Sequence, residues 1–151
     1  MTVPSYLLPA AVLLALSWAI VKLIPIGTPS IAAVTAVVVF GLIAITPLCG
    51  LMFDCGCDWP WFGLHHHCNI FDALAELKCP WCDHAVAGAL SMLSVFGASS
   101  FVAYRAAAVS ATANAKFTIG VLAGAVTFHL VSLVTGVLAA LATGYPLPFA
   151  S

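Results

Sequence analysis

Residues 31–49 read IAAVTAVVVFGLIAITPLC and contain no charged side chain. A helix of roughly 20 apolar residues is long enough to cross a bilayer core of about 30 Å. The apolar residues form a continuous run instead of alternating with polar ones. A segment inside lipid must also satisfy its own backbone hydrogen bonds, which favours a helix over a barrel strand here. The segment therefore predicts a membrane-spanning α-helix.

Three further segments have the same character and lie at approximately residues 6–24, 85–104 and 117–142. The chain has 151 residues, of which 64% are hydrophobic and only 6% are charged, and its mean hydropathy is +1.17. Soluble domains carry about 25% charged residues. Residues 1–151 are thus expected to form a single membrane domain, an all-α integral membrane protein with four transmembrane helices.

Charge limits the partners and indicates the orientation of this multi-pass protein. The sequence has no basic run interleaved with aromatic residues, so nucleic-acid binding is excluded, and membrane lipid is the expected surrounding. Lys22 ends the first predicted span, and Arg105 and Lys116 flank the third connection. By the positive-inside rule these positions face the cytoplasm. The loop at residues 50–84 and both termini are then expected to be extracytoplasmic.

This loop separates the second and third spans and concentrates the reactive side chains. All six cysteines, four of the five histidines and all five acidic residues lie between Cys49 and His84. Residues 69–78 have the pattern of a short amphipathic helix with Asn69 as its N-cap. Such a helix would hold Cys68 and Cys79, at its two ends, roughly 16 Å apart. The cysteines would then divide into two groups, unless the chain folds back on itself.

Metal binding is the main prediction for the loop. Cys55-Gly-Cys57 and Cys79-Pro-Trp-Cys82 have chelating spacings, and thiolate together with imidazole suits zinc, copper or iron. Alternation along an extended His65-His66-His67 triplet would turn the first and third rings to one side. The predicted metal ligands are Cys55, Cys57, His65, His67, Cys68, Cys79, Cys82 and His84.

Two other chemistries remain open for the same loop. Cys79-Pro-Trp-Cys82 has the Cys-x-x-Cys spacing of thiol–disulfide exchange and lies where the loop enters a membrane helix. In this outline the chain resembles the four-helix membrane oxidoreductases that pass disulfide electrons to quinone, with Cys55 and Cys57 in place of their second pair. Catalysis by Cys79 and Cys82 is therefore the alternative. The third interpretation is structural, because an even number of cysteines in an oxidising compartment can staple the loop with disulfides.

A few residues bear on the membrane environment. His129 is the one ionisable residue deep in a predicted span, and it is a candidate to ligate haem or a metal or to bond a neighbouring helix. Gly120-Val-Leu-Ala-Gly124 is a GxxxG pair that allows close helix approach, within the bundle or toward other subunits. The loop tryptophans that are expected to anchor at the lipid headgroups are Trp59, Trp61 and Trp81.

The size of the chain bears on whether it is an enzyme. Four short spans and one loop offer no evident pocket for a substrate. The sequence therefore predicts a metal-binding accessory subunit of a larger membrane redox or metalloenzyme complex, which associates with other membrane protein subunits and is not itself catalytic.

Overall fold

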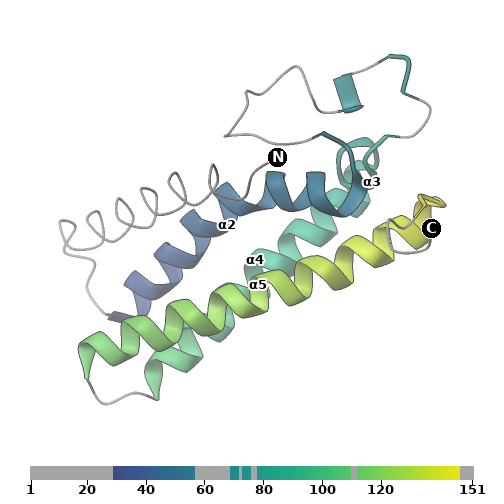
Figure 1. Ribbon diagram of the computed structural model, residues 1–151. Coiled ribbons are helices and arrows are strands. Elements are labelled where there is room, and N and C mark those ends of the chain that lie inside the picture. The colour runs from purple at the N-terminus through teal and green to yellow at the C-terminus, as the bar shows by residue number, and fades with distance from the viewer. Residues whose placement is uncertain (1–28, 57–68, 72, 76–77, 110–111, 147–151) are drawn as a thin grey trace.

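The computed structural model describes residues 29–56, 69–71, 73–75, 78–109 and 112–146. Among these residues, three helices are long and apolar enough to cross a membrane (Figure 1). They are α2 at Pro29–Phe53, α4 at Ala85–Ala108 and α5 at Ala113–Thr143. A short helix, α3 at Pro80–Asp83, and a 3₁₀ turn, η1 at Asn69–Phe71, lie between α2 and α4.

The all-α class and three of the predicted spans are confirmed. The helices α2, α4 and α5 contain the spans predicted at residues 31–49, 85–104 and 117–142, and each continues beyond its prediction. The span predicted at residues 6–24 lies outside the described residues. At about 1.5 Å per residue, α5 is about 46 Å long, so its ends extend past a hydrocarbon core of about 30 Å.

Glycine allows α5 to pack closely against both α2 and α4. A Cβ atom placed on Gly120 would lie 2.8 Å from the Ala33 Cβ and 2.9 Å from the Ala103 carbonyl oxygen. One placed on Gly124 would lie 2.6 Å from Val37. Both glycines are buried. The sequence left two roles open for the GxxxG pair, packing within the bundle or against other subunits. In the structure, both glycines serve packing within the bundle.

Aromatic rings fill the middle of the bundle. Phe128 of α5 is fully buried, and its ring centroid lies 5.8 Å from that of Phe40 on α2 and 5.7 Å from that of Phe96 on α4. Edge-to-face pairs of this kind add about 0.5–1.5 kcal/mol beyond the burial of area. The outer helix faces carry exposed apolar side chains such as Leu90 and Leu122, and this surface suits contact with lipid.

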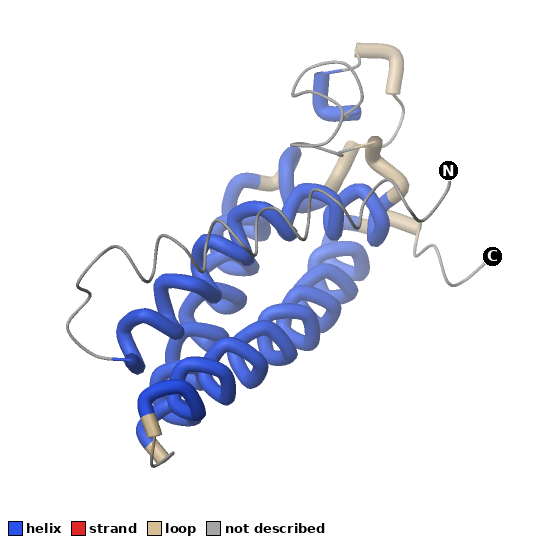
Figure 2. Tube along the Cα trace, turned by 60° about the vertical axis from the view of Figure 1, so that its left-hand side comes forward, coloured by secondary structure: helices blue, strands red, loops and turns tan. Residues whose placement is uncertain are grey.

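The two ends of the bundle differ in chemistry. The connection between α4 and α5 lies at the end remote from α3 (Figure 1 and Figure 2). There the Thr112 hydroxyl caps α5 by accepting a hydrogen bond from the Ala115 N–H at 3.3 Å. Arg105 in the last turn of α4 and Lys116 in the first turns of α5 lie at this same end. Arg105 and Lys116 therefore lie at the end of the bundle opposite to the cysteines that the structure describes.

α2 changes direction in its second half (Figure 1). Pro47 lies inside this helix. An interior proline lacks the N–H donor, and its ring clashes with the carbonyl group four residues earlier, so it kinks the helix. The bend turns the last part of α2, which includes Cys49, toward α3.

The amphipathic helix predicted for residues 69–78 is wrong. Among the described residues of this segment, helical structure is limited to η1, and a turn follows at Ala73 and Leu74. The Asn69 Oδ1 does not cap a helix but accepts a hydrogen bond from the Cys79 N–H at 3.1 Å. This bond closes the segment into a loop, and an isolated helix shorter than about 12–15 residues is only marginally stable in water. Asn69 and Cys79 therefore lie side by side.

Candidate metal centre

Three cysteine thiols from separate parts of the chain meet at one end of the bundle. Cys49 lies near the end of α2, Cys79 immediately before α3, and Cys82 within α3. The Sγ atoms of Cys49 and Cys79 are 2.9 Å apart, and the three Sγ atoms all lie within 4.8 Å of one another. In a tetrahedral site with metal–sulfur bonds of about 2.3 Å, the sulfur atoms are roughly 3.8 Å apart. This group could therefore hold one metal ion.

A fourth thiol, that of Cys55, adjoins the group. Its Sγ lies 3.5 Å from the Cys49 Sγ, and its side chain also interacts with Cys79. The chain reaches it through a tight turn after α2, in which φ is 47° at Asp54 and 69° at Gly56. Residues in this left-handed region end a helix and redirect the chain. All the described cysteines are free thiols, with no pair of them joined in a disulfide.

The fold of α3 presents its cysteines together. Pro80 occupies the start of the helix, where its missing N–H is not needed. The Cys82 N–H donates to the Cys79 carbonyl oxygen at 3.0 Å, which closes the turn between the two thiols. Gly88 of α4 lets α3 dock closely, because a Cβ atom there would collide with the backbone carbonyl oxygen of Trp81.

The chain matches no known protein family, no curated protein and no solved structure. The chemistry of the site is accordingly inferred from its own residues.

Aromatic side chains enclose the thiols. The ring centroids of Phe53 and Trp81 are 5.3 Å apart and those of Phe53 and Tyr145 are 5.7 Å apart, both edge to face. The Tyr145 hydroxyl donates to the Phe53 carbonyl oxygen at 2.6 Å. The prediction that Trp81 anchors at the headgroups is wrong, because docking of α3 against α4 and α5 leaves this side chain only 7% exposed. Trp59 and Trp61 lie outside the described residues.

The thiols differ in exposure and in acidity. Cys49, Cys55 and Cys79 are buried, whereas Cys82 is exposed. Hydrogen bonds from Cys49 and from Cys79 lower the pKa of Cys82 to about 3, against an opposing effect of burial. The bond with Cys49 also lowers the pKa of Cys79, but contacts with Cys55 and Cys82 and burial outweigh it and raise this pKa. The Cys82 thiol therefore holds the negative charge, and a metal cation would replace the proton of Cys79.

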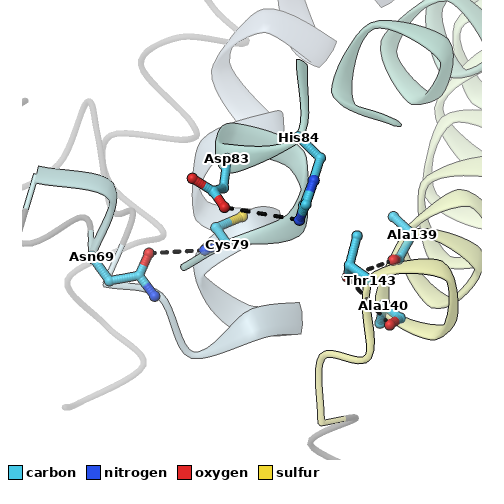
Figure 3. Close-up of polar contacts among 7 residues, drawn as sticks. All are labelled: Asn69, Cys79, Asp83, His84, Ala139, Ala140 and Thr143. Carbon is cyan, nitrogen blue, oxygen red and sulfur yellow. Dashed lines mark hydrogen bonds and ion pairs between the residues drawn. The ribbon is translucent and has the colours of Figure 1, made fainter. Parts of the chain in front are cut away.

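Of the predicted ligands, Cys79 and Cys82 lie in the group of three thiols, and Cys55 adjoins this group through Cys49 and Cys79. His84 is exposed and lies outside the thiol group, with its Nε2 at 3.8 Å from the Asp83 Oδ2 (Figure 3). The predicted ligands that lie outside the described residues are Cys57, His65, His67 and Cys68.

Cys49 is the member of the group that sequence reasoning missed. The sequence places it at the end of the second predicted span, in one group with Cys79, Cys82 and His84, but it is not among the predicted ligands. A signal was present in its spacing, because Cys49 and Cys55 are six residues apart. Two thiols at this distance can face one point when a helix ends between them, as α2 does at Phe53.

His129 lies near the middle of α5 and is exposed on the surface of the bundle. Its Nδ1 is 2.8 Å from the carbonyl oxygen of Ala125, one turn earlier in the same helix. Its ring centroid lies 5.7 Å from those of Phe40 and Phe128. The polar contact is therefore made within its own helix and not with a neighbouring one. Ligation of haem or a metal by this residue stays a prediction.

Proposed function

We propose that this membrane protein binds one metal ion through four cysteine thiolates. The ligands are Cys49, Cys55, Cys79 and Cys82. The observation that carries the proposal is the meeting of three Sγ atoms within 4.8 Å of one another at the end of a membrane bundle. The Sγ of Cys55, the fourth thiol, lies 3.5 Å from that of Cys49.

The ligand set favours particular metals. Four thiolate donors at one site suit zinc or iron. Copper remains within the predicted set, because cuprous ion also prefers thiolate ligands. The identity of the element is therefore an outcome of the first experiment.

A closed ligand set also bears on the role of the ion. Catalytic zinc sites keep a coordination position open for water or substrate, whereas structural sites use four protein ligands. Here the thiols of Cys49, Cys55 and Cys79 are buried. This supports a non-catalytic role for the centre, with the chain acting as an accessory subunit of a larger membrane redox or metalloenzyme complex on the extracytoplasmic side.

The test is elemental analysis of protein purified in mild detergent without chelators or a histidine tag. We expect about one zinc, iron or copper ion per chain, as a four-thiolate site holds a single ion. Cys49→Ser and Cys82→Ser should each lower this ratio severely, because serine is a poor ligand for these metals. Ser94→Ala, which changes an exposed residue near the middle of α4, is the control and should leave the ratio unchanged.

The histidine triplet needs its own comparison, because the sequence also predicts His65 and His67 as ligands. If the four thiolates suffice, His65→Ala and His67→Ala should retain the ion. Loss of the ion in these variants, with retention in Cys49→Ser, would replace the thiolate set by the ligand set predicted from the sequence. Metal-free protein under all of these conditions would reject the metal proposal.

Thiol–disulfide exchange stays the second candidate, and one observation favours it. Cys82 is exposed and its pKa is lowered, and a buried thiol, Cys79, lies beside it. These are the properties of an attacking thiolate with a partner thiol behind it. The discriminating measurement is mass spectrometry after alkylation of the metal-free protein, treated with and without quinone. A Cys79–Cys82 disulfide that forms and is reduced reversibly would favour exchange, and free thiols with bound metal would favour the first proposal.

A further inference from the structure

We propose that Asn69 is a positioning residue for the metal centre, which holds Cys55 and Cys79 at the separation that a single ion requires. This inference rests on the proposed function, since it concerns the frame of the same site. Asn69 contributes no thiol and has no place in either Cys-x-Cys or Cys-x-x-Cys spacing, so only the folded chain points to it.

The site needs such a frame because its ligands come from distant parts of the sequence. Cys49 and Cys79 are 30 residues apart. Cys49 lies in α2 and Cys55 just after it, whereas Cys79 lies just before α3 and Cys82 within it. Several thiolates around one ion repel one another, and a ligand set must be held close to its productive geometry by surrounding hydrogen bonds.

Asn69 bonds to both halves of the ligand set. Its backbone N–H donates to the Cys55 carbonyl oxygen at 2.8 Å. Its side-chain Oδ1 accepts a hydrogen bond from the Cys79 N–H at 3.1 Å, as Figure 3 shows. One half-buried residue thus joins the main chains of two ligands.

Asn69 is itself held by the end of α5. Its side chain forms a hydrogen bond with Tyr145, and the Tyr145 hydroxyl donates to the Phe53 carbonyl oxygen at 2.6 Å. The hydrogen bonds therefore connect the end of α2, the turn at Cys55, the start of α3 and the end of α5 around the thiols. A polar side chain with both an acceptor and a donor is needed to complete this connection, and the asparagine amide supplies both.

The experiment measures cobalt and zinc binding to metal-depleted full-length protein in detergent, by titration against a chromophoric chelator. Asn69→Leu removes the acceptor for the Cys79 N–H and should weaken affinity by about 10- to 100-fold, as loss of a residue that orients a ligand does. Asn69→Asp keeps an oxygen acceptor and should stay nearer to the wild-type affinity. Asn114→Leu changes an exposed asparagine in the first turn of α5, and this matched control should bind as the wild type does.

A second readout separates positioning from a general loss of structure. The ligand-field bands of bound cobalt report the geometry of the sulfur ligands, and they should change in Asn69→Leu while the helical circular dichroism stays constant. Unchanged affinity and bands in Asn69→Leu, with metal bound by the wild type, would overturn this inference alone. Metal loss together with loss of helical signal would also overturn it, by showing a role in folding. A wild-type chain that binds no metal would overturn the proposed function and this inference with it.

Discussion

At the scale of single residues, Cys82 differs from the other thiols of the group. It is exposed, whereas Cys49, Cys55 and Cys79 are buried. Its lowered pKa keeps it as a thiolate, the form that binds metal and attacks electrophiles. Cys82 is therefore the position at which the site meets water, and an incoming ion would contact this ligand before the buried ones.

The acidity of Cys82 predicts its reactivity. In metal-depleted protein, the iodoacetamide reaction of Cys82 should have nearly the same rate from about pH 5 to about pH 8, because a thiol with a lowered pKa loses its charge only below this range. For an ordinary thiol, with a pKa of about 8.5, the fraction present as thiolate rises roughly tenfold per pH unit over this range. Peptide mass spectrometry locates the label. Cys82→Ser should abolish the fast phase of labelling. An alkylation rate of Cys82 that rises with pH as that of an ordinary thiol does would disprove the lowered pKa.

At the scale of helices, Pro47 couples the course of α2 to the thiol group. The proline lies inside α2, and Cys49 follows it by two residues, after the bend. A helix without this residue would gain intrinsic stability of about 3 kcal/mol, yet it would point its last turn in another direction. A stable helix therefore favours another residue at position 47, whereas the geometry of the thiol group favours proline.

Pro47→Ala should change helix stability and metal affinity in opposite directions. We expect the thermal midpoint in detergent to stay the same or rise, because the helix recovers a hydrogen bond and loses a steric clash. Metal affinity should fall by about tenfold or more, a loss comparable with that of a residue that orients a ligand. Circular dichroism and chelator titration measure the two effects. Unchanged affinity would show that the bend does not position Cys49.

Helix packing provides a second prediction at this scale. Gly124→Leu should destabilise the bundle by about 1–3 kcal/mol, because overpacking forces neighbouring helices apart. The Cβ alone would lie 2.6 Å from Val37 and 2.9 Å from Ala103. Gly97→Ala is the control, since nothing lies within 4 Å of its Cβ position, and removal of a helical glycine should stabilise by about 0.5–1 kcal/mol. Thermal unfolding in detergent measures the stability of both variants. Equal midpoints for Gly124→Leu and Gly97→Ala would contradict the close packing at Gly124.

At the scale of the whole molecule, the thiol group lies at one end of the bundle, and Arg105 and Lys116 lie at the other. The positive-inside rule predicts that Arg105 and Lys116 face the cytoplasm. In intact cells that express the chain, a membrane-impermeant maleimide should then label Cys82 without permeabilisation, after removal of metal by an impermeant chelator. Val109→Cys combined with Cys82→Ser places an exposed thiol at the other end, and peptide mass spectrometry should find the label at residue 109 only after permeabilisation. The reverse pattern would place the metal centre inside.

Much of the fold could be predicted from the sequence. Lipid burial depends on the average apolarity of about 20 consecutive residues, which is a local property, and so the helices α2, α4 and α5 were readable in advance. The Cys79–Cys82 pair was readable for the same reason, because one turn of chain fixes its spacing. The prediction for residues 69–78 was wrong, because it used only the local pattern of apolar residues. The Asn69 Oδ1 instead accepts a hydrogen bond from the Cys79 N–H, ten residues further along the chain.

The run of residue types along the chain is enough to predict a bundle of apolar helices with the cysteines gathered toward one end. Which of the thiols meet depends on how the helices bend and dock. Cys49 joins the group because α2 bends and runs on to Phe53, and Cys55 and Cys79 approach through the two hydrogen bonds of Asn69. These contacts join residues far apart in the chain, and their free energy depends on helix direction and docking, which no local pattern of residues encodes.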